Sequence, residues 1–129
     1  MKKRNGFTLV ELLAVIVILA IILVIAVPQI LSTIDDATEG SMVSSAKMVA
    51  SAAETQYLTA QAKGDTFDLN GTCGTWAGLN TTDYSGCTYT IDSDSGVATV
   101  KLTGSGKFAG LYVCNATKTA ASVSKTACS

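Results

Sequence analysis

The chain begins with a short basic stretch that leads into one long apolar run. Across residues 7–27 only Thr8 and Glu11 interrupt the Leu, Val, Ile and Ala side chains. At ~1.5 Å per residue this run predicts a helix of about 31 Å, long enough to cross the hydrocarbon layer of a bilayer. We therefore expect a membrane-spanning helix near the N-terminus.

A second helical pattern follows Pro28, which removes a backbone donor and is expected to kink the helix without ending it. Apolar residues then recur mostly three or four positions apart, as on one face of an amphipathic helix. Lys63 followed by Gly64 predicts the helix end. The apolar face, expected to pack on an outer domain, comprises Ile34, Ala37, Met42, Ala46, Val49, Ala53, Tyr57 and Ala60. The opposite, polar face comprises Asp36, Ser44, Lys47, Ser51 and Glu54.

Beyond the helix, an irregular segment is followed by alternation of period two. Residues 65–83 are rich in Gly, Thr and Asn and predict a loop that covers a sheet. Strands are predicted at residues 87–92, 97–103 and 107–114. In the third strand, Ala109, Leu111 and Val113 are expected on one side, with Phe108 and Tyr112 on the other. Short links between the strands predict an antiparallel meander, and hence an α+β fold with one long N-terminal helix packed on a small sheet.

Charge is distributed unevenly about the apolar run. Lys2, Lys3 and Arg4 precede the run, and Asp35, Asp36 and Glu39 follow it. The positive-inside rule then predicts a cytoplasmic N-terminus, with the body of the chain outside. A cleaved secretory signal is the alternative, but the run is longer than the usual stretch of about 7 to 15 residues. Its polar residues also lie at the cytoplasmic end, away from where such a signal is cut.

Glu11 is a carboxylate inside the apolar run, and intramembrane carboxylates usually have a partner. No Lys, Arg or His follows it in the run. A cut between Gly6 and Phe7 would create an α-amino group one helical turn from Glu11, a cation that complements the carboxylate. Between neighbouring chains this pair would set the axial register of the helices, because an unmatched buried charge is costly. A tolerated carboxylate that reaches the headgroups is the alternative.

Residues 2–13, Lys-Lys-Arg-Asn-Gly followed by Phe-Thr-Leu-Val-Glu-Leu-Leu, closely resemble the start of type IV prepilins and pseudopilins. With the apolar helix and Pro28, the resemblance extends over residues 1–60. It implies that a prepilin peptidase cuts after Gly6 and methylates the Phe7 amine. It also implies that Glu11 recruits an adjoining subunit through that amine. The implied product is a homo-oligomeric helical filament, built by an inner-membrane assembly platform and its ATPase.

Composition fits a membrane-tethered chain with one small outer domain. The 129 residues are 48% apolar, and the outer part is rich in Thr, Ser, Gly and Ala. We divide the chain into a leader (1–6), an assembly helix (7–31), an amphipathic helix (32–64) and a globular β domain (65–129). Loss of the leader removes three of nine basic residues and changes the formal charge from −1 to −4. The sequence therefore provides no basis for binding to nucleic acid.

Four cysteines lie in the part expected to be exported, where disulfides form: Cys73, Cys87, Cys114 and Cys128. Of the three possible pairings, Cys73 with Cys87 and Cys114 with Cys128 is favoured because each bond closes a local loop. Pairing of Cys73 with Cys114 and Cys87 with Cys128 stays open. The resemblance adds support for the Cys114–Cys128 bond, because many type IV pilins have a disulfide-bounded loop at the C-terminal end. A zinc site is not expected without His or a CxxC spacing.

Two short motifs suggest ligands but fit turns better. Asp92-Ser93-Asp94-Ser95-Gly96 resembles the beginning of a calcium loop, yet it lacks the third ligand and the distal Glu, so a hairpin turn is favoured. Gly104-Ser105-Gly106-Lys107 lacks the flanking residues of a phosphate loop. With no His and no recognisable pair of carboxylates, we expect neither an enzyme nor a bound cofactor. We assign no metal ligand, although the resemblance leaves calcium at Asp92 and Asp94 open, because some pseudopilins bind calcium in the outer domain.

The sequence thus predicts a structural subunit of a type IV pilus or pseudopilus. It would wait in the membrane as a single-pass protein and then join an extracellular fibre or a cell-envelope pseudopilus. By resemblance, Glu11 favours a self-assembling major subunit over a tip subunit. Surface pilus, secretion pseudopilus and competence pseudopilus stay open. The alternative function is a monomeric, signal-anchored extracellular binding module that keeps residues 1–6.

Overall fold

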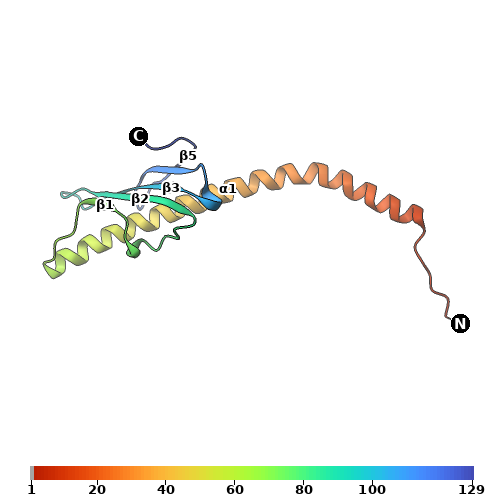
Figure 1. Cartoon of the computed structure of the whole chain (residues 1–129), viewed down its shortest axis with the longest axis horizontal. Helices are drawn as coiled ribbons and strands as arrows, with labels where there is room; N and C mark the ends of the chain where they lie inside the picture. The colour runs from red at the N-terminus through yellow and green to blue at the C-terminus, as the bar shows by residue number, and fades with distance from the viewer. Residues whose placement is uncertain (1) are drawn as a thin grey trace. The chain divides into compact units, whose positions relative to one another are not determined.

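The computed structural model of the chain describes residues 2–129 and divides into two compact units, Met1–Asp36 and Ala37–Ser129. Helix α1, Leu9–Lys63, contributes to both units. The second unit adds an antiparallel sheet in the order β1-β2-β3-β4-β5 (Figure 1). Its strands are β1 Asn70–Thr72, β2 Tyr84–Ile91, β3 Ala98–Gly104, β4 Tyr112–Ala116 and β5 Val123–Ser124. The predicted α+β fold, a long N-terminal helix packed on an antiparallel sheet, is confirmed.

Helix α1 ends at Lys63, where the sequence predicts its end, and the end has the hydrogen bonds of a Schellman motif. Gly64 adopts a φ of 77°, in the left-handed region that a residue without a side chain enters at no steric cost. Its N–H donates to the carbonyl of Gln61 at 3.2 Å, and the N–H of Asp65 donates to the carbonyl of Ala60 at 2.9 Å. These bonds satisfy carbonyl groups that the helix end leaves unpaired.

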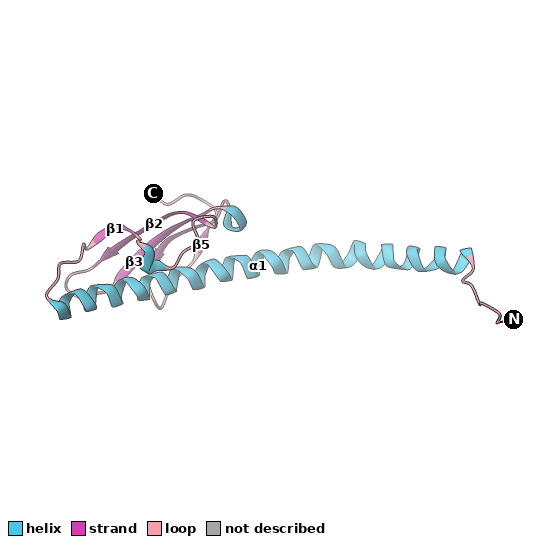
Figure 2. Cartoon of the chain, turned by 60° about the horizontal axis from the view of Figure 1, so that its bottom comes forward, coloured by secondary structure: helices cyan, strands magenta, loops and turns pink. Residues whose placement is uncertain are grey.

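In the second unit, one face of α1 packs against the sheet, which lies to one side of this part of the helix in Figure 2. Ile34 and Ala37 are exposed, so the prediction that they belong to the packed face is wrong. The face begins at Met42 instead. The predicted residues that are fully buried are Met42, Ala46, Val49 and Ala53.

Strands β2 and β3 form the centre of the sheet and follow the predicted alternation. Their register pairs Cys87 with Leu102 and Ile91 with Ala98. The side chains that face α1 are buried: Tyr89 and Ile91 on β2, and Ala98, Val100 and Leu102 on β3. Period-two alternation identifies these strands because one face is dry and the other meets solvent.

The third predicted strand, at residues 107–114, is wrong at its start. Gly106–Phe108 form a short 3-10 helix, η2, and β4 begins only at Tyr112. Gly106 and Gly110 have φ values of 54° and 79°, which an extended strand does not contain. Two glycines therefore replace the expected strand start by a turn, in keeping with the turn predicted for residues 104–107.

Phe108 lies in this turn and enters the core. Its side chain is 2% exposed, and its ring centroid lies 5.1 Å from that of Tyr84 in the core. Ala109, predicted on the opposite side from Phe108, is exposed. The backbone of Gly104 lies so close to the Phe108 carbonyl that a side chain at position 104 would overlap it. Phe108 thus enters the core because the chain bends sharply around it.

The two outer strands are too short for alternation to predict. β1 lies inside residues 65–83, the segment predicted as a loop, and pairs with β2. β5 has two residues and pairs with β4. The rest of that segment covers the core as expected, through Phe67, Trp76 and Leu79. The rings of Phe67 and Trp76 contact the ring of Tyr89. The pKa of Tyr89 is raised, mainly by burial and to a smaller extent by the negative charge of Asp68.

Two disulfides tie the remaining segments to the sheet. Cys73 is bonded to Cys87, with Cα atoms 5.4 Å apart, and Cys114 is bonded to Cys128, with Cα atoms 5.3 Å apart. This is the connectivity that local loop closure favours. The first bond joins the segment after β1 to β2, and the second joins the C-terminal segment to β4.

Candidate functional site

The segment ahead of α1 contains the bond between Gly6 and Phe7. Residues 2–8 form neither helix nor strand, and all of their side chains are exposed. Phe7 itself is 88% exposed. An exposed stretch without regular structure is the kind of substrate that proteolytic enzymes cut. The predicted cleavage point is therefore accessible in this structure.

Helix α1 begins with two reciprocal hydrogen bonds between Thr8 and Glu11. The N–H of Glu11 donates to Thr8 Oγ1 at 3.2 Å, and the N–H of Thr8 donates to Glu11 Oε2, also at 3.2 Å. The carbonyl of Thr8 accepts the first helical bond, from the N–H of Leu12 at 3.2 Å. This is a capping box, which satisfies N–H groups that a helix start leaves unpaired. The box sets the helix start just after the Gly6–Phe7 bond.

A search for cations alone misses Thr8 as a partner of Glu11. The signal for it is present in the sequence, because Thr8-Leu9-Val10-Glu11 matches the pattern of a capping box ahead of an apolar run. The box uses only Oε2 of the carboxylate. Within residues 2–129, Glu11 Oε1 accepts no hydrogen bond. Glu11 can therefore cap its own helix and still bind a second donor.

The apolar part of α1 is uncovered. Every Leu, Ile and Val side chain from position 9 to position 25 is more than half exposed. Among the described residues, α1 is the helix whose length and composition would allow it to cross a membrane. So large an apolar surface normally contacts lipid or other protein. The N-terminal helix is thus suited to membrane anchoring.

Pro28 lies inside this helix, which continues through it without interruption. The carbonyl of Gln29, the next residue, accepts hydrogen bonds from the hydroxyls of Ser32 at 3.4 Å and Thr33 at 3.0 Å. A kink is expected at Pro28 because proline removes a helical hydrogen-bond donor. This kink stays a prediction.

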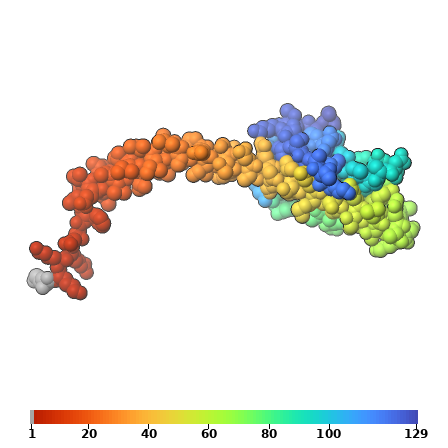
Figure 3. Space-filling model, turned by 180° about the vertical axis from the view of Figure 1, so that it is seen from behind, coloured from red at the N-terminus to blue at the C-terminus, as the bar shows by residue number. Residues whose placement is uncertain are grey.

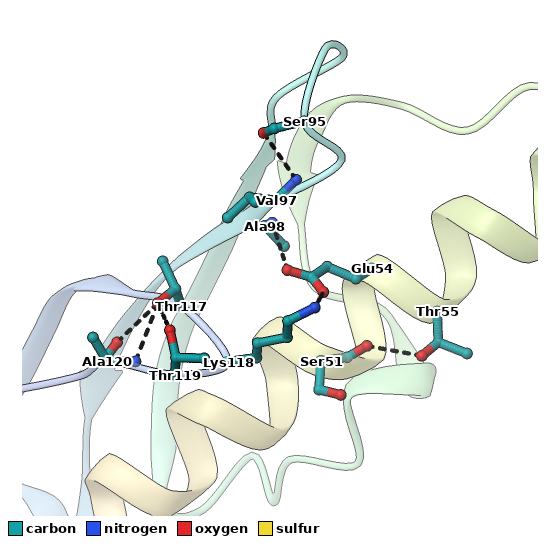
Figure 4. A network of polar contacts seen from close by, with 10 residues as sticks. All are labelled: Ser51, Glu54, Thr55, Ser95, Val97, Ala98, Thr117, Lys118, Thr119 and Ala120. Atoms are coloured by element: carbon teal, nitrogen blue, oxygen red, sulfur yellow. Dashed lines mark hydrogen bonds and ion pairs between the residues drawn. The ribbon is translucent and has the colours of Figure 1, made fainter.

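In the second unit, the buried carboxylate of Glu54 joins groups from separate segments of the chain (Figure 4). The helical pattern assigns it to the polar face, and this is wrong, because Glu54 is only 8% exposed. Its Oε1 accepts the N–H of Ala98 at 3.2 Å, and its Oε2 lies 2.7 Å from Lys118 Nζ. Ala98 starts β3 and Lys118 follows β4. One carboxylate therefore joins helix, sheet and C-terminal segment, and its two donors compensate for its burial.

The C-terminal segment is held by further contacts of lysines. Lys125 Nζ lies 3.6 Å from Glu39 Oε1, and Lys101 Nζ donates to the carbonyl of Ser129 at 3.2 Å. Figure 3 shows this segment, in dark blue, beside the yellow part of α1. With the Cys114–Cys128 bond, these contacts fix the chain that follows β4.

The segment between β2 and β3 is the predicted hairpin turn. Asp92 Oδ1 accepts the N–H of Asp94 at 2.9 Å and that of Ser95 at 3.4 Å. These backbone donors lower the pKa of Asp92. Gly96 has a φ of 70°, and its N–H donates to the Asp92 carbonyl at 2.7 Å. The side chain of Asp92 thus serves the turn itself.

No three His, Cys, Asp or Glu side chains within residues 2–129 gather closely enough to hold a metal ion. A hollow of about 530 Å³ lies beside the Cys73–Cys87 disulfide. Its lining includes the hydroxyl-bearing residues Thr72, Thr75, Thr81 and Ser85, and no charged side chain.

Comparison with known proteins identifies one segment. Residues 1–27 match a family described as the prokaryotic N-terminal methylation motif. No curated protein and no solved structure matches the chain. The matched segment contains the accessible Gly6–Phe7 bond, the Thr8–Glu11 capping box and most of the uncovered apolar helix.

Proposed function

We propose that this chain, whose residues 1–27 carry the signal of type IV prepilins, is a structural subunit that polymerises through its N-terminal helix. One observation carries the proposal. The methylation motif coincides with an accessible Gly6–Phe7 bond that directly precedes an uncovered apolar helix. A motif at an N-terminus could arise by chance, but these two features are what cleavage and subsequent assembly need.

Processing comes first. The precursor lies in the membrane with Lys2, Lys3 and Arg4 on the cytoplasmic side, as the positive-inside rule favours. A prepilin peptidase hydrolyses the Gly6–Phe7 bond and transfers a methyl group from a donor to the new amine. The exposure of residues 2–8 supports this step.

Assembly then brings the helices of neighbouring subunits together. Their apolar side chains exchange lipid contacts for contacts with one another, and Glu11 accepts the Phe7 amine of an adjoining subunit. Oε1 of Glu11 is available for this amine because the capping box uses Oε2. A subunit at the wrong offset would leave both charges unmatched in an apolar core, at a cost of about 3 kcal/mol or more.

The second unit is the part that the filament displays. Its disulfides suit a small domain in an oxidising compartment. A surface pilus and a secretion or competence pseudopilus fit this reading equally well. In each case the partners are further copies of the chain, the peptidase, and the membrane platform with its ATPase.

The proposal is tested by shearing cells that express the chain with an active or an inactive prepilin peptidase. The active cells are expected to release filaments that contain the chain, visible by negative-stain electron microscopy and immunogold labelling. The inactive cells are expected to retain the precursor in the membrane. Release that is independent of the peptidase, or a processed chain that stays monomeric in the membrane, would contradict the proposal in favour of an anchored binding module.

A further inference from the structure

We propose that the Thr8–Glu11 capping box keeps the Gly6–Phe7 bond outside helix α1, which makes Thr8 a positioning residue for cleavage of the precursor. The inference rests on the proposed function, since it assumes that this bond is hydrolysed. Hydrolysis adds one water across the bond and releases Gly6 as a carboxylate and Phe7 as an amine. Thr8 takes no part in this chemistry, and it acts through the conformation of the two residues before it.

A cap is needed here because the sequence offers a competing helix start. Asn5 lies three residues ahead of Thr8, and Asn is among the strongest N-cap residues, stronger than Thr alone. With Asn5 as N-cap, Gly6 and Phe7 would become the first two helical residues. The bond between them would then lie in the first turn, where its backbone cannot adopt the extended form in which peptidases bind their substrates.

The structure shows which start prevails and which contacts favour it. Residues 2–8 are not helical, and α1 begins at Leu9. A start at Thr8 gains two side-chain bonds, because Glu11 at the third helical position reaches back to the Thr8 N–H. A start at Asn5 would place Thr8 at that third position, and the short hydroxyl of Thr8 cannot return the bond. The capping box therefore decides the competition.

At the membrane surface, the competition between a helix start at Thr8 and one at Asn5 has an energetic consequence. Unpaired N–H groups at a helix start are costly where water is scarce, so the helix will use whichever cap is available. If Thr8 cannot cap, extension to Asn5 is the nearest way to satisfy these groups. Weak helix formation by Gly6 opposes the extension but does not forbid it.

Four variants of the full-length precursor test the inference: Thr8→Ala, Thr8→Ser, Asn5→Ala and the double variant Asn5→Ala/Thr8→Ala. Each is reconstituted in lipid vesicles with purified prepilin peptidase, and the initial rate of cleavage is measured by mass spectrometry of the N-terminal peptide. Thr8→Ser keeps the capping hydroxyl, and Asn5→Ala removes only the competing cap. In micelles, carbon chemical shifts of residues 5–8 report where the helix begins.

We expect Thr8→Ala to be cut about fivefold more slowly, with residues 5–7 turned helical. Thr8→Ser and Asn5→Ala should match the wild type. The double variant should recover most of the wild-type cleavage rate. Without a cap at Asn5, the helix has no reason to extend over the Gly6–Phe7 bond. This recovery separates positioning from direct reading of the Thr8 side chain by the peptidase, which the double variant would not restore.

Two results would overturn the inference while leaving the proposed function intact: Thr8→Ala cut at the wild-type rate, or a double variant as slow as Thr8→Ala. A wild-type precursor that the peptidase does not cut at all would overturn the proposed function and the inference together. The two failures are therefore distinguishable in one set of assays.

Discussion

Glu11 Oε2 accepts the backbone N–H of Thr8 at 3.2 Å, while Thr8 Oγ1 accepts the N–H of Glu11 at the same distance. One carboxylate oxygen thus completes the start of the helix, and the other makes no hydrogen bond within residues 2–129. The cap needs an oxygen acceptor, and the proposed contact with a neighbouring amine needs a negative charge. These two requirements can be separated by substitution.

Glu11→Gln should keep the cap and lose assembly. A glutamine oxygen can still accept the Thr8 N–H, so insertion and cleavage after Gly6 are expected to continue normally. Without its charge, residue 11 leaves the neighbouring Phe7 amine unmatched, and the filament yield should fall about a hundredfold. The yield is measured by immunoblot of sheared and membrane fractions. Normal filaments from this variant would show that Glu11 does not select the subunit register.

Removal of the Glu54 carboxylate should destabilise the second unit. Glu54→Ala leaves the N–H of Ala98 without its acceptor in the core, and a loss of about 2 to 3 kcal/mol in the free energy of unfolding is expected. Lys118→Ala should cost about 1 kcal/mol, since its ammonium group is partly exposed. Urea unfolding of the full chain in detergent, followed by the fluorescence of Trp76, the single tryptophan, measures both.

Lys125→Ala is the matched control for Lys118→Ala. Its ion pair with Glu39 is longer, at 3.6 Å, and more exposed, so a change below about 0.5 kcal/mol is expected. Equal effects of the two lysine variants would mean that burial of Glu54 adds nothing to its contact with Lys118.

Gly104→Ala should be far more harmful than Gly71→Ala. A Cβ at position 104 would overlap the backbone carbonyl of Phe108, which cannot move without displacing η2, and a loss of about 3 kcal/mol is expected. At position 71 the nearest atom is Tyr89 Oη, at an ordinary 3.5 Å, so a change within about 0.5 kcal/mol is expected. The same unfolding measurement compares them, and similar losses would refute the close approach at Gly104.

The turn at Asp92 should respond to acid. Backbone N–H groups of Asp94 and Ser95 lower the pKa of Asp92 below its ordinary value of 3.8. Because the pKa of Asp92 is lower in the folded than in the unfolded state, its hydrogen bonds stabilise the folded state fully above about pH 4. This contribution is lost as the pH falls through the pKa of the folded state. Asp92→Asn keeps an acceptor oxygen and removes the titration. Its unfolding midpoint should fall less than that of the wild type between pH 4 and 2, and parallel profiles would contradict this account.

The long-range pattern of the chain predicts most of the fold. The apolar run, the stripe from Met42 to Ala53 and the alternation in β2 and β3 each repeat often enough to reveal a face, and Gly64 signals the helix end. The start of β4 is mispredicted because alternation does not register the positive φ values of Gly106 and Gly110. β1 and β5 contain too few residues to alternate.

Glu54 shows a different limit. A carboxylate beside polar neighbours on a helix is normally solvated, and its burial depends on an N–H from β3 and an ammonium group from beyond β4. Neither donor is near it in sequence, so helical periodicity could not reveal this pairing. Thr8 and Glu11 are the opposite case, because their spacing alone signals the capping box.

The most direct test of the account is mass spectrometry of the N-terminal peptide, in both the sheared extracellular fraction and the membrane fraction of the same cells. The account predicts a peptide that begins at methylated Phe7 in the sheared material, produced by cleavage after Gly6. A peptide that still carries Lys2 to Gly6, found only in membranes of cells with an active prepilin peptidase, would contradict it and leave a simple membrane anchor.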